Sequence, residues 1–324
     1  MSTAPVPFSS SRLRTAIATR EFLVTAEVAP PCGTDIKTML QQAATLANYV
    51  HAVNVTDSSR AVLGMSPVVA SGLIQQHLGI ETICQLACRD RNRIGLQGDL
   101  LGAWAMGIRH ILALTGDPVK AGNQPTARPV FEYESTRLLQ LIGKLNQGKD
   151  ADGHDLPDQG TNFLAGAAID PQSASWSGLQ RRFERKLAAG AEFFQSQLIT
   201  DFEQLAKFMQ LLGKPSGKPI LAGIFLLKSA KNALFINKYV PGVNIPPAII
   251  DRLAQAPNPL QEGIAIAAEQ VKLAQQLCDG VHLMAVKVEH LIPQILDQAG
   301  IAKLDLDLLP SHYGSSSLPQ QLSQ

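Results

Sequence analysis

Two acidic residues, Glu27 and Asp117, lie at or just beyond the ends of short apolar runs. The segment RHILALTGDP at 109–118 shows the pattern most plainly, because its apolar run stops at a glycine, the aspartate and a proline. Glycine lets a backbone pass close to a ligand, and proline prevents a strand from continuing. A carboxylate at such a strand end could serve acid/base chemistry. On this strand alone, an aspartate that merely caps the next loop explains the pattern equally well.

Other reactive side chains are scattered along the chain. The seven histidines show no spacing typical of a zinc site, and His110 and His282 lie at the beginnings of apolar runs, where structural histidines are expected. No G-x-S-x-G is present, so a serine nucleophile elbow is not predicted. Cys84 and Cys88 have apolar neighbours, which favours core thiols over reactive ones.

The bulk composition indicates a globular protein with a large core. The chain has 324 residues, of which 45% are hydrophobic and 17% charged, and its formal net charge is +1. That balance gives no basic face, so nucleic acid is not an expected partner. No apolar run of membrane-spanning length is present. The four cysteines form no C-x-x-C pair, which is typical of a reduced, cytoplasmic chain.

Eight apolar runs, each predicted to be a strand, alternate with helical patterns. They lie at 22–28, 52–56, 81–87, 111–114, 163–169, 193–199, 219–225 and 280–286. Strands that alternate with helices indicate an α/β fold with a parallel sheet, and eight repeats favour a closed (β/α)8 TIM barrel in one domain over an open doubly wound sheet. No G-x-G-x-x-G follows a strand, which further lowers the dinucleotide-binding alternative.

Helices are expected between these strands, and the domain boundaries follow from them. Two helices are expected to begin near 34 and near 66. Further helices are expected at 91–106, with Asp90 as its cap, and at 133–145, 178–189, 201–212 and 289–298. Two or three more are expected within 226–276. We assign 21–303 to the barrel, 1–20 to a polar N-terminal arm or short helix, and 304–324 to a flexible C-terminal tail.

In a TIM barrel, the reacting residues come from the carboxyl ends of the strands. The predicted strand ends carry Glu27, Thr56, Asp57, Gln85, Thr115, Gly116, Asp117, Ala167, Ala168, Gln197 and the segment 285–287. Glu27 and Asp117, two carboxylates on different strands, suit acid/base catalysis or the orientation of an organic cofactor. The small residues would leave room for a flat ring, although tight helix–strand packing explains them as well. The residues alone therefore predict a barrel enzyme with an acidic site, with or without a cofactor.

The order and spacing of several motifs resemble the methylenetetrahydrofolate reductase family in its short, bacterial-like form. The resemblance runs from about 22 to 302 and is carried by TAEVAPP (25–31), AVNVTD (52–57), GIRHILALTGDP (107–118), KLAAGAEFFQSQ (186–197), GIFLL (223–227) and DGVHLMAV (279–286). It implies an eight-stranded α/β barrel that binds FAD non-covalently. It also implies that a hydride passes from NAD(P)H to the flavin and then to 5,10-methylenetetrahydrofolate, which becomes 5-methyltetrahydrofolate.

The resemblance assigns roles by position. Glu27 matches the acid that protonates N10 of the folate and opens its methylene bridge, and Asp117 matches the aspartate that lies between pterin and flavin. Gln197 matches a folate contact, and Asn232 falls where a polar folate or nicotinamide contact is expected. The FAD-contacting positions fall on Thr56, Gln85, Thr115, Gly116, Asp117, Tyr133, Ala168 and Lys186. Without the resemblance, Lys186 is a solvated helix-face lysine.

The chain also departs from the family pattern. Gln85 stands where many members have histidine, Thr115 where many have arginine, and strand five ends in AGAAIDP. The family phenylalanine that stacks on nicotinamide or folate falls near 235–236. These departures motivate one alternative, a partner-dependent or non-catalytic folate- or flavin-binding subunit. A separate alternative is a flavin-free barrel that uses Glu27 and Asp117 as an acid/base pair. The family resemblance also implies a homo-oligomer.

Overall fold

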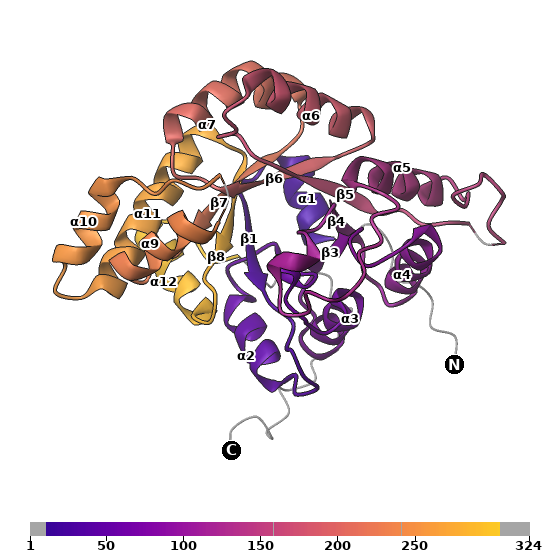
Figure 1. The fold of residues 1–324 in the computed structure, drawn as a ribbon, viewed down its shortest axis with the longest axis horizontal. Helices are drawn as coiled ribbons and strands as arrows, with labels where there is room; N and C mark the ends of the chain where they lie inside the picture. Colours follow the sequence, from indigo (N-terminus) through magenta and orange to yellow (C-terminus); the bar gives the residue numbers. More distant parts are fainter. Residues whose placement is uncertain (1–10, 158, 241, 305–324) are drawn as a thin grey trace.

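Eight parallel strands close into a barrel in the computed structural model, which describes residues 11–157, 159–240 and 242–304 (Figure 1). Each strand pairs with the next along the chain, and β8 pairs with β1. The strands are β1 Leu23–Val28, β2 Ala52–Val55, β3 Thr82–Ala87, β4 His110–Leu114, β5 Leu164–Ile169, β6 Phe193–Leu198, β7 Ile220–Phe225 and β8 Gly280–Met284. The predicted (β/α)8 fold is confirmed, and all eight predicted strands are present.

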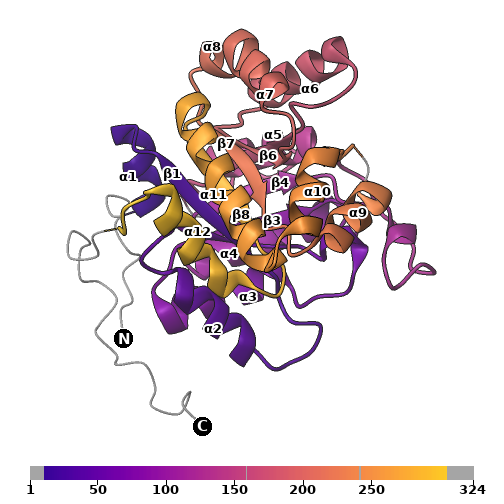
Figure 2. The ribbon, with the colours of Figure 1, turned by 90° about the vertical axis from the view of Figure 1, so that its left-hand side faces the viewer.

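Helices surround the barrel on its outside (Figures 1 and 2). They are α1 Arg12–Thr19, α2 Lys37–Leu46, α3 Pro67–Leu78, α4 Arg93–Ala105, α5 Ser135–Asn146, α6 Trp176–Ala188, α7 Phe202–Phe208, α8 Lys214–Ser216, α9 Ala230–Tyr239, α10 Pro247–Gln255, α11 Pro259–Leu277 and α12 Ile292–Ala299. Short turns η2 Ser59–Ala61, η3 Val119–Ala121 and η5 Glu289–Leu291 follow β2, β4 and β8, and the π-helical segment η4 Met209–Gly213 joins α7 to α8.

Two helix predictions need adjustment. Asp90 does not cap α4, because the side chain of Asn92 accepts the N–H of Gly95 and the helix begins after it. The helix expected at 201–212 stops being α-helical at Phe208 and continues as the π-helical segment η4. The long connection after β7 does contain three helices, α9, α10 and α11.

The barrel has two separate apolar regions because strand residues alternate between its outside and its interior. Outward-facing side chains such as Val53 and Ile111 pack against the helices in the main core. Inward-facing side chains at the amino ends of the strands form a second cluster with Leu13 and Ala16 of α1. Helix α1 therefore closes the amino end of the barrel and lies at the opposite end from α9, as Figure 2 shows.

The attachment of α1 depends on Glu81, which precedes β3. Its carboxylate accepts hydrogen bonds from the Ser11 hydroxyl (2.9 Å) and from the N–H groups of Arg12 and Leu13, and lies 2.9 Å from Nε2 of His110. Burial raises the pKa of this carboxyl, but these hydrogen bonds and the charge of His110 outweigh burial and hold it below the ordinary value. Within the segment expected to be an arm or a short helix, residues 12–19 thus form a helix that packs against the barrel. Residues 1–10 and 305–324 lie outside the described residues.

Candidate active site

Glu27 lies on the inner wall near the carboxyl end of β1. Its side chain is 20% exposed, and its Oε2 lies 3.8 Å from Nε2 of His282 on the neighbouring strand β8. His282 is buried and faces the barrel interior, so it belongs to the candidate site although its sequence position indicated a structural role. No local signal could have found it, because the register that pairs Thr25 with His282 and places both on the interior side with Glu27 arises only when β8 meets β1.

Below Glu27, the barrel interior is polar. Oγ1 of Thr25 lies 3.0 Å from Nδ1 of His282 and accepts a hydrogen bond from the Gln195 carboxamide at 3.1 Å. Gln195 in turn pairs with Asn54, whose nitrogen donates to Oε1 of Gln195 at 2.7 Å. Branched apolar residues usually fill this layer of a TIM barrel, so the four polar side chains mark a specialised interior. Gln195 and Asn54 were not predicted as site residues.

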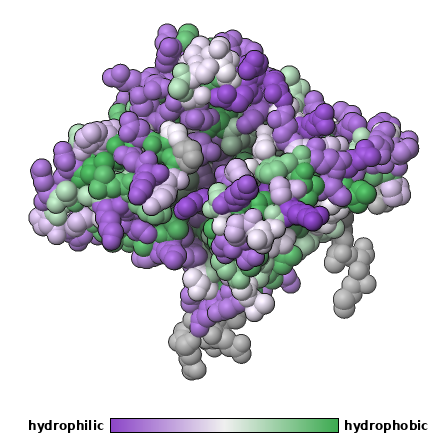
Figure 3. Space-filling model, viewed as in Figure 1, coloured by the Kyte–Doolittle hydropathy of each residue, from purple (hydrophilic) through white to green (hydrophobic). Residues whose placement is uncertain are grey.

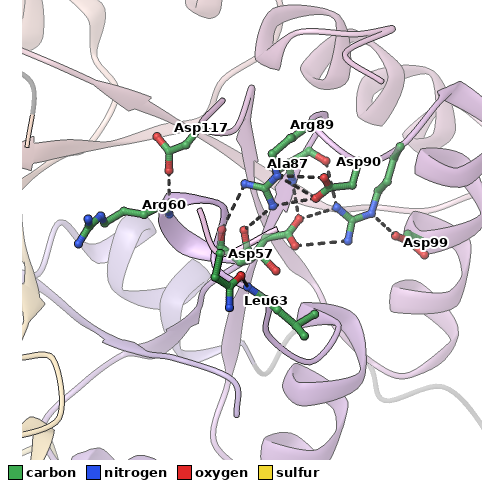
Figure 4. A network of polar contacts seen from close by, with 11 residues as sticks. Asp57, Arg60, Leu63, Ala87, Arg89, Asp90, Asp99 and Asp117 are labelled. Carbon is green, nitrogen blue, oxygen red and sulfur yellow. Dashed lines mark hydrogen bonds and ion pairs between the residues drawn. The ribbon is translucent and has the colours of Figure 1, made fainter. Parts of the chain in front are cut away.

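Asp117 lies on an exposed loop just beyond β4. Its Oδ2 accepts the backbone N–H of Arg60 at 2.8 Å, so the carboxylate anchors the loop after β2 across the barrel mouth (Figure 4). Gly116 before it has φ of 93°, and a Cβ there would lie 2.9 Å from Cβ of Arg89. A residue with a side chain is therefore excluded at Gly116 by both conformation and space. Asp117 thus anchors the loop after β2, whereas the sequence alternative had it cap the next loop along the chain.

A buried ion pair stiffens the same side of the mouth. The carboxylate of Asp57, at the tip of β2, accepts from Arg91 at 2.6 Å and from the N–H of Ala87 at 2.8 Å (Figure 4). Burial raises the pKa of the Asp57 carboxyl, and the charge of Arg91 opposes that effect. Arg89 adds hydrogen bonds to the carbonyls of Ser58 (3.2 Å) and Asp57. The Asp57 carboxylate therefore links the end of β2 to the end of β3 and to Arg91, and it is not available as a catalytic acid.

Three predicted site residues meet in one pocket beside β5 and β6. The pocket is lined by Ala168, Ile169, Asp170, Leu179, Arg182, Phe183, Lys186 and Gln197. Nζ of Lys186 donates to the carbonyl of Ala168 at 2.6 Å, which leaves two of its three protons for a ligand. Burial and the neighbouring charge of Arg182 lower the pKa of Lys186, so an anion in this pocket would relieve an unfavourable concentration of positive charge.

The remaining predicted residues have mixed surroundings. Thr56 and Gln85 are buried on the inner wall at the ends of β2 and β3. The hydroxyl of Thr115 accepts the N–H of Ser135 at 3.1 Å, so it fixes the start of α5. Tyr133 is half-buried just before that helix.

The loop after β7 contains Asn232, one of the predicted contact residues. The Asn232 carboxamide oxygen accepts the N–H of Lys228 at 3.1 Å and so braces this loop. Phe235 is exposed on α9, where its ring packs against Tyr239 with centroids 4.7 Å apart. The guanidinium of Arg60 lies 6.0 Å from the Phe235 ring, so α9 and the loop after β2 approach each other at the mouth. Figure 3 shows this face, with hydrophobic residues gathered over α9 and α10.

Within 11–157, 159–240 and 242–304, no three histidine, cysteine, aspartate or glutamate side chains gather as metal ligands. Over the same part of the chain, no helix is both long and apolar enough to span a bilayer.

Comparison with known proteins identifies the family. The family model described as methylenetetrahydrofolate reductase matches residues 12–300. The chain belongs to the methylenetetrahydrofolate reductase family. The match includes α1, whose first residue is Arg12, and ends just after α12. The family therefore contains the whole barrel and the helix that closes its amino end.

Curated relatives carry the family name. A protein of Caenorhabditis elegans named probable methylenetetrahydrofolate reductase (NADPH) is 26% identical over 257 residues, which are 76% of this chain and 36% of that protein. A 5,10-methylenetetrahydrofolate reductase of Pectobacterium carotovorum is 25% identical over 206 residues, which are 62% of this chain and 63% of that protein. The matched part of the chain thus spans less than two thirds of the length of each relative.

Solved structures share the barrel. An uncharacterized protein from Clostridium thermocellum, which binds two copies of 5-methyl-5,6,7,8-tetrahydrofolic acid, has a TM-score of 0.60 at 15% identity and covers 89% of this chain and 98% of its own. A 2,3-dimethylmalate lyase has a TM-score of 0.51 at 13% identity, with 94% and 92% covered. At these identities the likeness shows the fold alone.

Proposed function

We propose that the chain reduces 5,10-methylenetetrahydrofolate to 5-methyltetrahydrofolate, with FAD as cofactor and NAD(P)H as hydride donor. The observation that carries the proposal is Glu27, a partly exposed carboxyl on the inner wall of a barrel that belongs to this family. Opening the methylene bridge requires a proton at N10 of the folate, and a carboxyl on a rigid strand can be held close to that nitrogen. The iminium that forms at N5 then accepts the hydride.

The pocket beside Lys186 is proposed to hold part of FAD. Lys186 and Arg182 would bind its pyrophosphate, and the apolar side chains of Leu179 and Phe183 would support a less polar part. Gly116 lets the backbone approach a flat ring, and Ala168 adds little bulk at the end of β5. When bound, FAD would carry the hydride between nicotinamide and folate. Asp117 and Gln197 are proposed to contact the folate.

One observation favours a second candidate, a folate- or flavin-binding barrel that acts only with a partner. Asp117 and Asn232, both expected to contact ligand, already accept backbone N–H groups of neighbouring loops. Each carboxylate or amide oxygen has further acceptor capacity, so these bonds are compatible with ligand binding as well. The isolated chain distinguishes the candidates, because the reductase alone would turn over NAD(P)H and an acceptor without a partner.

The visible spectrum of the purified chain, before and after anaerobic addition of 5-methyltetrahydrofolate, tests the proposal. We expect an oxidised flavin spectrum that bleaches, which reports cofactor, substrate and hydride path together. A flavin that bleaches with NAD(P)H alone would keep the flavoenzyme and exclude folate. A colourless chain that refuses added FAD would contradict the proposal and favour the flavin-free barrel.

A further inference from the structure

A network of hydrogen-bonded polar side chains lies below Glu27 in the barrel interior, and the proposed reaction does not yet use it. Thr25, Asn54, Gln195 and His282 are each at most 4% exposed, and they come from four different strands. Polar side chains buried in this way destabilise a fold unless their hydrogen bonds are satisfied. We therefore look for a function of this network, because its hydrogen bonds are made deep inside the barrel, where apolar side chains usually pack.

The donors and acceptors of these four side chains fix the direction in which the hydrogen bonds run. The Gln195 carboxamide nitrogen has two protons, and it donates to Oδ1 of Asn54 at 3.2 Å and to Oγ1 of Thr25 at 3.1 Å. Its oxygen accepts from Asn54 at 2.7 Å. The amide pair of Asn54 and Gln195 thus presents an N–H to Thr25, and the Thr25 hydroxyl is left to donate its own proton onwards.

Two acceptors lie near the Thr25 hydroxyl. Nδ1 of His282 is 3.0 Å from Oγ1, whereas the carbonyl oxygen of Val281 is 3.5 Å away. Hydroxyl donors prefer short separations, so the shorter contact favours donation of this proton to Nδ1. A neutral imidazole that accepts at Nδ1 carries its own proton on Nε2. That nitrogen faces Oε2 of Glu27 at 3.8 Å.

We propose that Asn54, Gln195 and Thr25 hold His282 in its Nε2–H form, and that this N–H stabilises the carboxylate that Glu27 becomes after it protonates the substrate. His282 is a positioning residue in this scheme, because it acts through Glu27. The proposal rests on the proposed function only for the identity of the proton acceptor. The tautomer of His282 is a property of the chain alone.

The surroundings of Glu27 explain why such a donor is useful. A second carboxyl, that of Glu289 in η5, interacts electrostatically with Glu27. Burial raises the pKa of Glu289, and the negative charge of Glu27 raises it further, although hydrogen bonds from backbone N–H groups oppose this effect. Among the described residues, His282 is the group found in an ion-pair contact with Glu27. A fixed N–H at this point offsets the repulsion that a newly formed carboxylate would meet.

Nitrogen-15 NMR of the histidine rings, on the full chain labelled at histidine, tests the tautomer without flavin or folate. In the neutral form of the His282 ring we expect Nδ1 to be unprotonated and Nε2 to be protonated. The signals of His282 are assigned by their loss in His282→Gln. Thr25→Val removes the donor and should convert the ring wholly or partly to the Nδ1–H form, whereas Thr25→Ser should not. Gln195→Met should act in the same direction as Thr25→Val.

An internal control is present in the chain. Nδ1 of buried His51 accepts the backbone N–H of Val24 at 3.0 Å, so its tautomer should be unchanged in every variant. An Nδ1–H ring in the unmodified chain, or an unchanged His282 in Thr25→Val with normal His51 signals, would overturn the proposal. If Thr25→Val fails to fold, as judged by loss of the His51 signals, Gln195→Met decides.

The kinetic consequence is measured separately, as the single-turnover oxidation of reduced flavin by 5,10-methylenetetrahydrofolate. We expect His282→Leu to slow this step roughly tenfold, because an N–H that faces the carboxylate from 3.8 Å is lost. His282→Gln, which retains an N–H of similar reach, should recover most of the rate. Equal rates in the Leu and Gln variants would overturn the role of the N–H. Absence of any flavin would instead contradict the proposed function and leave the NMR result standing.

Discussion

At the scale of single residues, the chemistry proposed for this chain depends on Glu27. Glu27→Gln keeps the shape of the side chain and removes its transferable proton. We expect the folate half-reaction to slow by about 10²- to 10⁴-fold, the usual contribution of a general acid. FAD content and the NAD(P)H half-reaction should stay near those of the unmodified chain, because neither needs this proton. Stopped-flow absorbance measures both half-reactions, and an unimpaired folate step would exclude Glu27 as the acid.

Asp117 combines two roles that different substitutions separate. Asp117→Asn keeps an oxygen to accept the N–H of Arg60 but loses the charge, so we expect altered flavin reactivity with little change in flavin binding. Asp117→Ala also loses the anchor of the loop after β2, and we expect weaker binding of folate in addition. Titration of the oxidised protein with 5-methyltetrahydrofolate measures both. Identical behaviour of the two variants would show that the loop contact has no influence.

The thiols provide a residue-scale prediction that is independent of ligands. Burial raises the pKa of Cys84, Cys88 and Cys278 to about 12, whereas Cys32 is exposed. Because the thiolate is the reactive form, only Cys32 should react with an aromatic disulfide reagent in the native state. We expect one thiol to react per folded chain and none in Cys32→Ser, with the remaining cysteines reacting after denaturation. Rapid reaction of a second thiol in the folded chain would contradict this assignment.

At the scale of elements, one carboxylate, that of Glu81, accepts several of the hydrogen bonds that join α1 to the barrel. The pKa of Glu81 is held below its ordinary value of 4.5, so its contribution to stability is present above that value and is lost as the pH falls through the folded-state pKa. We expect Glu81→Gln to lower the free energy of unfolding by about 1–3 kcal/mol near neutral pH, because charge-assisted hydrogen bonds to α1 are weakened. Denaturant unfolding followed by circular dichroism measures this.

The pH dependence of the free energy of unfolding shows whether the loss in Glu81→Gln comes from the charge of Glu81 or from an unspecific effect of the substitution. The difference between Glu81→Gln and the unmodified chain should shrink as the medium becomes acidic, since the native carboxylate is then protonated as well. Glu203→Gln, on the exposed first turn of α7, is a matched control and should change stability little. A constant difference across the whole pH range would show that the charge of Glu81 contributes nothing.

The observed boundaries of the strands and helices show which of them could be predicted from local sequence patterns. Apolar runs with turn residues behind them identified all eight strands, because a strand buried on both faces has a continuous apolar signature. The cap of α4 was misplaced at Asp90, since that side chain is engaged by Arg89, a contact that depends on how the loop folds back. The segment 201–212 has no local signal for its change to π-helical geometry at Met209.

At the scale of the whole molecule, the sequence by itself determined the fold class, the strand order and the placement of the candidate residues at strand ends. Short apolar runs, and their alternation with helical patterns, are local properties that can be recognised without knowing any long-range contact. The motifs at 25–31 and 107–118 likewise predicted the family, which the match over 12–300 confirmed. The roles of Gln85, Thr115 and Tyr133 toward FAD stay predictions.

Only the tertiary structure decided which side chains meet inside the barrel. His282 and Glu27 are separated by most of the chain, and they become neighbours because β8 pairs with β1 when the barrel closes. The same closure brings Asn54 and Gln195 together across the interior and leaves α1 to seal the opposite end. Burial and hydrogen bonding between distant strands depend on strand register and barrel closure, which no local pattern of residues encodes.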